Sequence, residues 1–327
     1  MPLVLTEADV ARTLEMPALI GAMRGALRSF SAGDVVQPVR ATLRIEPAGG
    51  YYAPMPAHLR DERGGALGVK SVAFFPGNAG GTLPTHLATV LLLDPASGAL
   101  LAILDGRLIT EMRTAAVTAL SVDLLARPEA RRLAILGSGV QARSHLRAIA
   151  LVRPLAAVRV WSRTGAHAAR FAREMAGAVG CPIEPAATVR EAMRGADVVV
   201  AVTAAREPIV EAAWLEAGMH LCAVGSSAAD MRELDGGAVA RCRVFVDSRA
   251  AARVEAGDLL LAEAEGVVGP DHVVAELGEV AGGAPGRRSV DEITLFKSLG
   301  LAVEDVASAR LAFERAVALG LGTEVPL

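Results

Sequence analysis

The strongest fold signal in this chain is the stretch Leu133-Ala134-Ile135-Leu136-Gly137-Ser138-Gly139-Val140-Gln141-Ala142. An apolar run leads directly into a GxGxxA motif, and residues 140–151 continue with apolar side chains at helical spacing. In a strand–turn–helix unit of this kind, the glycines allow a tight turn and let a pyrophosphate approach the helix N-terminus. Because the motif stands in that context, we predict a Rossmann module that binds a dinucleotide. The residues expected at the pyrophosphate are Gly137, Gly139, Val140 and Gln141.

From about residue 131 onward, short apolar runs alternate with helical stretches. This alternation is typical of a parallel sheet built from βαβ units. The expected strands are residues 133–136, 157–161, 197–202, 220–224 and 243–247. The expected helices are residues 140–151, 165–179, 188–193, 211–216 and 250–264.

The chain before the motif has a different pattern. Two helical segments open it, with Thr6 as the cap of the first and apolar helical spacing over residues 16–30. A mostly antiparallel sheet, a connecting helix and a terminal helix are expected beyond them. The predicted strands are residues 41–45, 67–75, 88–93 and 100–104 with a turn at 94–98, and the predicted helices are residues 110–126 and 302–319.

A length of 327 residues suits two domains. We therefore predict the α/β class, with a Rossmann dinucleotide-binding domain over residues 121–301. A second, α+β domain is predicted over residues 1–120, joined by the C-terminal helix and tail at residues 302–327. We expect this second domain to bind the substrate and to dimerise.

Composition excludes several classes of protein. The chain is 52% hydrophobic and 21% charged, as in well-packed globular proteins, and its net charge of -3 offers no basic field for nucleic acid. The longest apolar runs are far shorter than the roughly 20 residues of a membrane helix. Glu7 and Asp9 interrupt the start of the chain, where an export signal needs a basic and then apolar stretch. The three cysteines lack metal-ligand spacing. We expect a cytoplasmic protein that binds no metal, nucleic acid or membrane.

The residues after the second strand of the Rossmann module indicate which dinucleotide is preferred. An NAD-specific module places an Asp or Glu there to hold the 2′-hydroxyl of the adenosine ribose. This chain has Ser162-Arg163-Thr164 instead. The Arg163 guanidinium suits a 2′-phosphate, and the two hydroxyl groups add donors. We predict NADPH as the cofactor, with NADH as the alternative. If Arg163 does not bind the cofactor, it is a solvated surface arginine.

Three cations stand among apolar neighbours in the first part of the chain: Arg40, Lys70 and Arg113. Such charges are costly to bury unless an anion pairs with them, and a substrate carboxylate would be such an anion. A structural salt bridge is the alternative for each. Thr85 and His86 follow Pro84 in a similarly apolar setting, where a single histidine is more often structural than functional.

At these residues the chain resembles the ornithine cyclodeaminase/μ-crystallin family, and the resemblance covers nearly the whole sequence. The matching motifs, in chain order, are Gly68-Val69-Lys70, Leu83-Pro84-Thr85-His86, Leu104-Asp105-Gly106, Arg113-Thr114-Ala115-Ala116, the Gly137 fingerprint, Arg232-Glu233-Leu234-Asp235, Glu255-Ala256-Gly257-Asp258, Glu276-Leu277-Gly278-Glu279 and Phe296-Lys297-Ser298-Leu299-Gly300.

The resemblance implies a homodimer in which the N-terminal sheets of two subunits join in a barrel-like interface. It also implies that Arg40, Lys70 and Arg113 hold a substrate carboxylate. Thr85, His86 and Thr114 are then expected close to the cofactor. Further cofactor contacts are expected from Thr203, Val224 and Ser298, the last also touching the substrate.

One departure from the family pattern separates its branches. Cyclodeaminases carry an Asp where this chain has Ser227, and a serine is a poor general base without a group to activate it. Ser162-Arg163-Thr164 and Phe296-Lys297-Ser298 resemble the ketimine reductase branch, in which NADPH delivers hydride to the C=N carbon of a cyclic imino acid such as pyrroline- or piperideine-2-carboxylate.

In that interpretation the catalytic candidates are Lys70, Arg113, Ser227 and Glu255. Lys70, its pKa lowered by neighbouring positive charges, would assist proton transfer, and Glu255 is a weaker candidate for the acid. The alternatives are an NAD-dependent ornithine cyclodeaminase that releases ammonia, an alanine dehydrogenase, and a non-enzymatic NADPH-dependent binding protein of the μ-crystallin type. The cations at Lys70 and Arg113 argue against a purely binding role.

Overall fold

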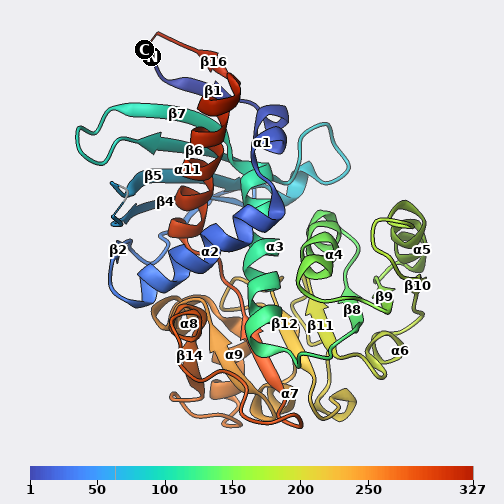
Figure 1. The fold of residues 1–327 in the computed structure, drawn as a ribbon. Helices are drawn as coiled ribbons and strands as arrows, with labels where there is room; N and C mark the ends of the chain where they lie inside the picture. Colours follow the sequence, from blue (N-terminus) through green and yellow to red (C-terminus); the bar gives the residue numbers. More distant parts are fainter. Residues whose placement is uncertain (63, 327) are drawn as a thin grey trace. The chain divides into compact units, whose positions relative to one another are not determined.

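The structure is a computed structural model that describes residues 1–62 and 64–326. Its chain forms two compact units (Figure 1). The first unit comprises Met1–Arg113 and Gly300–Leu327, and the second comprises Thr114–Leu299. The chain passes between the units twice, once within the helix α3 (Gly106–Leu125) and once between Leu299 and Gly300. No helix in the described part of the chain is long and apolar enough to cross a membrane.

The first unit is built on a sheet in the order β16-β1-β7-β6-β5-β4-β2, with β3 paired to β4. Its long strands β4 to β7 are antiparallel neighbours, whereas β1 runs parallel to β7. The strands are β1 (Leu3–Leu5), β2 (Val35–Val36), β3 (Leu43–Ile45), β4 (Gly50–Leu59), β5 (Ala66–Phe74), β6 (His86–Leu93), β7 (Leu100–Asp105) and β16 (Thr323–Glu324).

Helices cover one face of this sheet. They are α1 (Glu7–Thr13), α2 (Met16–Ser31) and α11 (Ala302–Leu319), with a short 3-10 turn η1 (Pro76–Asn78) before β6. Figure 1 shows α11 lying across the strands, and it packs on α2, β4 and β5. Thr6 caps α1 through a reciprocal pair of bonds with Asp9, as its sequence predicted. Because β5 alternates buried and half-buried residues, one face meets this helix layer and the other stays partly open.

The second unit contains an entirely parallel sheet in the order β10-β9-β8-β11-β12-β15-β13-β14. The chain proceeds from β8 to β9 and β10 on one side, then returns to β11 and β12 on the other. This reversal makes the carboxyl ends of β8 and β11 a topological switch point, where α/β folds bind ligands. The strands are β8 (Arg132–Leu136), β9 (Ala157–Trp161), β10 (Ile183–Pro185), β11 (Val198–Ala201), β12 (His220–Ala223), β13 (Arg243–Val246), β14 (Val273–Glu276) and β15 (Thr294–Lys297).

Short helices connect these strands, and several begin with a side-chain cap: Thr188, Asp235 and Ser248 each accept a bond from the backbone of the helix that follows. The helices are α4 (Val140–Val152), α5 (Gly165–Glu174), α6 (Val189–Met193), α7 (Gly236–Ala240), α8 (Arg249–Glu255), α9 (Gly257–Ala264) and α10 (Leu277–Ala281), with the 3-10 turn η2 (Ala212–Trp214).

The α/β class is confirmed, but several elements differ from expectation. Residues 211–216 form only the 3-10 turn η2, and residues 250–264 form two helices interrupted at Ala256, rather than one. Strands β1, β4, β10, β14 and β15 were not predicted. Pro54 and Pro56 are unusual inside a strand, yet β4 accommodates them because β2 and β3 pair only with its two ends.

Candidate cofactor and substrate sites

The turn between β8 and α4 has the geometry of an anion-binding site. Gly137 has a φ of +117°, and a Cβ there would lie 2.8 Å from the carbonyl oxygen of Val202. No other residue type fits that conformation and space. Gly139 is the N-cap of α4 and faces open space where its Cβ would lie, while Ala142 is fully buried against the sheet. The turn therefore leaves the N-terminus of α4 accessible to a phosphate group.

Polar groups around this turn fit a nucleotide. The side-chain oxygen of Gln141 is buried and has no hydrogen-bond partner in the described chain, so a ligand hydroxyl could donate to it. Val140 is 51% exposed at the start of the helix. The Ser138 hydroxyl donates to that of Ser162 at 3.0 Å, and Arg143 donates to the carbonyl of Ser138 at 2.7 Å. These bonds hold the turn beside the end of β9.

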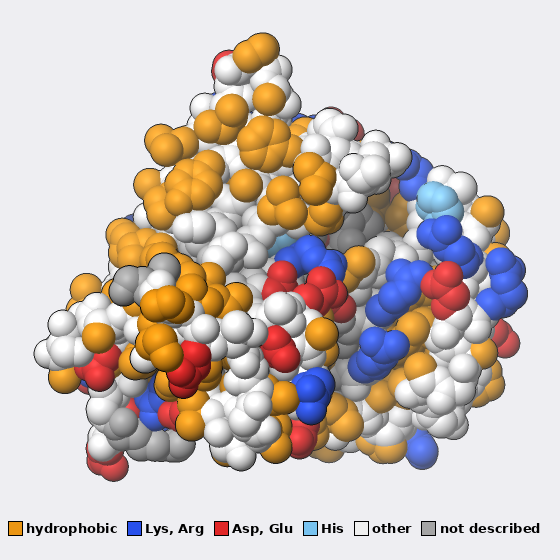
Figure 2. All heavy atoms as spheres, turned by 90° about the horizontal axis from the view of Figure 1, so that it is seen from above, with side chains coloured by type: hydrophobic (Ala, Val, Ile, Leu, Met, Phe, Trp, Pro, Cys, Tyr) orange, Lys and Arg blue, Asp and Glu red, His pale blue; other side chains and the backbone are white. Residues whose placement is uncertain are grey.

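The residues after β9 are accessible and strongly positive. Ser162 is half-buried, and Arg163 and Thr164 are exposed. Figure 2 shows Lys and Arg side chains gathered on the side that carries α4 and α5. Five arginines belong to this region, and two of them, Arg143 and Arg170, pair with Glu174. The five are Arg143, Arg147, Arg163, Arg170 and Arg173. The field of such a group attracts phosphate.

Other predicted cofactor residues follow the next strands of the same sheet. Thr203 comes after β11, Val224 and Ser227 come after β12, and Ser298 follows β15. The amide and hydroxyl of Thr203 both donate to Glu233, at 2.6 and 2.7 Å. Val224 and Ser227 are half-buried, and Ser298 is buried. The remaining catalytic candidate, Glu255, is half-buried at the end of α8.

Two predicted cations of the first unit, Lys70 and Arg113, are buried beside two acids, Glu304 and Asp305. These four residues are here called the lysine–arginine cluster. The Lys70 ammonium lies 2.6 Å from a carboxylate oxygen of Asp305. Arg113 pairs with Glu304 at 2.7 Å and with Asp305 at 3.0 Å. Both acids are fully buried in the first turn of α11. At Gly300, whose φ is +81°, a Cβ would lie 2.5 Å from Arg113. For Lys70 and Arg113 the protein itself therefore supplies anions, which is the salt-bridge alternative considered from the sequence.

Burial and charge shift the acid–base properties of this cluster. Burial lowers the pKa of Lys70 to about 8; Asp305 opposes this shift, and Arg113 and Arg40 add to it. The neighbouring cations are thus the lesser cause, contrary to the sequence-based expectation. Burial, followed by Lys70 and Arg113, also lowers the pKa of His86 to about 4, so this imidazole is neutral at pH 7. Burial raises the pKa of the Asp305 carboxyl, but the adjacent cations bring it below its usual value.

The structure brings four of the predicted substrate and cofactor residues together in the first unit: Arg40, Lys70, His86 and Arg113. His86 begins β6, and the half-buried Arg40 lies close enough to influence the Lys70 ammonium. Thr85 precedes β6 and is half-buried. Thr114 directly follows Arg113 in α3 and is buried.

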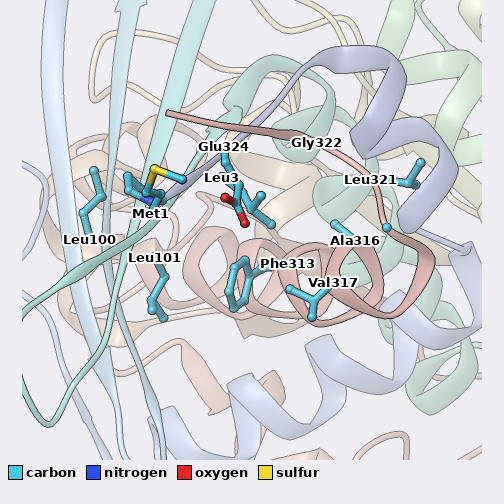
Figure 3. A pocket seen from close by; sticks show the side chains of 12 residues that line it. Met1, Leu3, Leu100, Leu101, Phe313, Ala316, Val317, Leu321, Gly322 and Glu324 are labelled. Atoms are coloured by element: carbon cyan, nitrogen blue, oxygen red, sulfur yellow. The ribbon is translucent and has the colours of Figure 1, made fainter. Parts of the chain in front are cut away.

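A separate hollow in the first unit is not part of this cluster. It has a volume of about 510 Å³ and lies between the two chain ends and the C-terminal part of α11 (Figure 3). Most of the residues that line it are hydrophobic, including Leu3, Leu101 and Phe313, and Glu324 is its charged side chain. None of the predicted site residues borders it. No cluster of His, Cys, Asp or Glu in the described residues could hold a metal ion.

Sequence reasoning missed five charged residues of these sites: Glu233, Asp258, Lys297, Glu304 and Asp305. A signal for one of them was present. The chain carries 33 basic residues, of which only Lys70 and Lys297 are lysine. Both are buried. Where arginine is otherwise always used, a lysine marks a position that requires a compact ammonium group.

The parallel sheet, its glycine turn and the buried cation cluster define a nicotinamide-dependent oxidoreductase. The chain belongs to the Ornithine cyclodeaminase/mu-crystallin family, whose model matches residues 1–320. It is 41% identical over 319 residues to the ketimine reductase mu-crystallin of Macropus fuliginosus, covering 96% of this chain and 97% of that protein.

Two solved structures have the same fold over almost the full length. One is the Delta(1)-pyrroline-2-carboxylate reductase of Thermococcus litoralis in complex with NADH and L-proline, with a TM-score of 0.95, 38% identity and coverage of 99% of this chain and 100% of that one. The other is an archaeal alanine dehydrogenase dimer with bound NAD, with a TM-score of 0.93, 32% identity and 99% coverage of both chains. The family expectation is confirmed.

Proposed function

We propose that this protein is an NADPH-dependent reductase of small imino acids that transfers hydride to the C=N carbon of a cyclic ketimine such as pyrroline-2-carboxylate or piperideine-2-carboxylate. The observation that carries the proposal is the buried Lys70, with a pKa of about 8, held beside Arg113. A lysine with this pKa can give up a proton near neutral pH. The names of the ketimine and pyrroline-2-carboxylate reductases among its relatives support the same chemistry.

The charges of the cluster suit an anionic imine. Lys70 and Arg113 pair with Asp305 and Glu304. Arg113 and Arg40 add positive potential at the Lys70 ammonium, which suits a substrate carboxylate. The reduction consumes one imine, one NADPH and one proton, and yields the cyclic amino acid and NADP⁺. When bound, the dinucleotide supplies the hydride. Lys70 supplies the proton to the imine nitrogen, and neutral His86 adds no further positive charge.

A spectrophotometric screen tests this reaction. Enzyme is mixed with NADPH or NADH and with pyrroline-2-carboxylate, piperideine-2-carboxylate, or pyruvate plus ammonia, and absorbance loss is followed. We expect the two cyclic imines with NADPH to be the best pair. Ammonia release from ornithine without net absorbance change would instead identify a cyclodeaminase, which the uncharged Ser227 argues against. Preferred turnover of pyruvate with ammonia would identify an alanine dehydrogenase.

The preference for NADPH rests on Arg163. We expect Arg163→Ala to raise the KM for NADPH about 10- to 100-fold, because a charge-assisted bond to the 2′-phosphate is lost, and to leave the KM for NADH unchanged. Arg170→Ala is the matched control: this exposed arginine of α5 pairs with Glu174 at 3.7 Å. Equal effects of R163A on both dinucleotides would contradict the assignment.

We further propose that the first unit binds the substrate and forms a homodimer through the face of its sheet opposite α11. On that face Val69, Leu91 and Ile103 lie opposite one another across β5, β6 and β7, and Leu67 lies opposite Leu93. All five are only half-buried in the single chain. Figure 2 shows hydrophobic side chains gathered on the side where these strands lie. A continuous apolar sheet face of this kind is typical of an interface between subunits.

We expect Leu91→Glu to weaken dimerisation at least about 100-fold, because it buries a charge within the apolar contact. Light scattering at micromolar concentration should then report the mass of one chain, against two chains for the unmodified protein. Val254→Glu, at a side chain that is 56% exposed on α8, is the control and should remain dimeric. A monomeric unmodified protein, or a dimeric L91E variant, would rule out this interface.

A further inference from the structure

A single buried carboxylate fastens the ends of two neighbouring strands in the second unit. Glu233 is 0% exposed and accepts hydrogen bonds from the amide and hydroxyl of Thr203 at 2.6 and 2.7 Å, and from the amide of Gly225 at 2.8 Å. Thr203 comes just after β11, and Gly225 just after β12. Because β11 and β12 are adjacent in the sheet, Glu233 determines the spacing of the loops that leave them.

The packing at this point leaves no room for adjustment. A Cβ on Gly225 would lie 1.9 Å from the carbonyl oxygen of Thr203 and 2.6 Å from a carboxylate oxygen of Glu233. Any side chain there would push the two strand ends apart. The glycine and the carboxylate are therefore two parts of one arrangement that holds the loops in contact.

Two more buried charges complete a closed ring. One oxygen of Asp258 accepts bonds from the amides of Glu233 and Leu234, at 2.7 and 2.9 Å. Its other oxygen lies 2.8 Å from the Lys297 ammonium, which also donates to the carbonyl of Ser226, the residue after Gly225. Lys297 ends β15, next to β12. Replacing a buried ion pair by apolar residues of similar volume is often neutral or stabilising, so we interpret this ring as setting the geometry of the loops rather than as a source of stability.

The position of this ring relates to one half of the dinucleotide. The turn after β8 suits the pyrophosphate, and the end of β9 suits the adenosine ribose. The ends of β11 and β12 lie on the other side of β8, where the nicotinamide half of a bound dinucleotide would lie. We propose that Glu233 is a positioning residue for the nicotinamide half of the cofactor, which it serves by holding the loops after β11 and β12. The proposal rests on the dinucleotide part of the proposed function and is independent of the imine substrate.

The test compares binding of a whole and a truncated cofactor to the Glu233→Gln variant. The amide keeps the shape of the carboxylate but replaces one acceptor with a donor, which then opposes the Gly225 or Thr203 amide. We expect the affinity for NADPH, measured by calorimetry, to fall at least about tenfold. The affinity for 2′-phospho-ADP-ribose, which lacks the nicotinamide, should change less than about twofold because that half would contact the ends of β8 and β9. If NADH binds tighter than NADPH, NADH and ADP-ribose replace this pair.

Asp197→Asn is the matched control. Asp197 accepts amide bonds from Arg131 and Arg132, both at 2.9 Å, and pairs with Arg127 at 2.6 Å. It directly precedes β11, however, at the opposite end of that strand from Thr203. This variant should lose thermal stability without losing affinity for either ligand. Equal losses for both ligands in E233Q, no loss for either, or a selective loss in D197N would each overturn the proposal.

Two further outcomes separate this proposal from the proposed reaction. If the unmodified protein binds NADPH and E233Q shows the selective loss, but no imine is reduced, the reaction fails and the positioning role stands. If the unmodified protein binds neither NADPH nor NADH, both fail. If E233Q does not fold, Glu233→Asp is used instead. Its carboxylate keeps the charge but is one methylene group farther from Thr203 and Gly225. A selective loss of at least about threefold is then expected for the whole cofactor, and its absence overturns the role.

Discussion

Lys70→Met is expected to lower kcat for imine reduction at least about 100-fold, the usual size of a general acid–base contribution, while the affinity for NADPH changes less than about twofold. The substitution removes the proton donor and one cation of the lysine–arginine cluster, but the Gly137 turn and the residues after β9 belong to the second unit. Steady-state kinetics and a cofactor titration measure the two quantities. Unchanged turnover on every imino acid, with intact NADPH binding, would refute the catalytic role.

The proton-donor role of Lys70 predicts that activity falls as the pH rises. Because the pKa of Lys70 is about 8 in the folded protein, the ammonium is present below pH 8 and lost above it. We expect kcat/KM for the imine to fall above about pH 8 and this alkaline limb to be absent in K70M. The affinity for pyrrole-2-carboxylate, a flat ring acid that does not itself titrate in this range, should fall over the same pH range. An identical alkaline limb in K70M would assign the titration to another group.

Most of the second unit was predictable because its signals are local. The Gly137 turn, the strand before it and the helix after it are contiguous in sequence, and β11 is the continuous apolar run expected of a buried parallel strand. By contrast, β15 lies between β12 and β13 in the sheet although it follows both in sequence. The alternation of strands and helices along the chain therefore does not predict it. The prolines of β4 argued against a strand in the sequence. The strand accepts them because β2 and β3 pair only with its two ends.

The partners of the predicted site residues were beyond local reasoning. Lys70 and Arg113 stood out because charges among apolar residues need an explanation. The acids that neutralise them lie far along the chain, 191 positions or more later, in helix α11. The sequence of that helix indicates only that acidic residues are favourable in its first turn. Glu233 was likewise visible only as part of a family motif. Tertiary packing determines which buried charges form pairs. No residue spacing in a single sequence indicates these pairs.

Asp305→Asn is expected to lower the free energy of unfolding by about 3–5 kcal/mol, the cost of leaving one member of a buried ion pair without its counter-charge. Asp305 is fully buried between Lys70 and Arg113. Urea unfolding followed by circular dichroism measures the loss. Glu15→Gln is the control, because Glu15 pairs with Arg315 of the same helix α11 at 2.6 Å but is 64% exposed, and an exposed pair contributes less than about 1 kcal/mol.

The double variant Lys70→Met, Asp305→Asn separates stability from function. Its Asn oxygen still accepts from Arg113 and no ammonium is left unpaired, so we expect most of the lost stability to return while activity stays as low as in K70M. Acid unfolding provides a second check. The folded-state pKa of Asp305 is lowered, so its stabilising contribution is present above the unfolded pKa and is lost as the pH falls through the folded one. That acid-dependent loss should be smaller in D305N. A double variant as unstable as D305N would show that Asp305 serves Arg113 rather than Lys70.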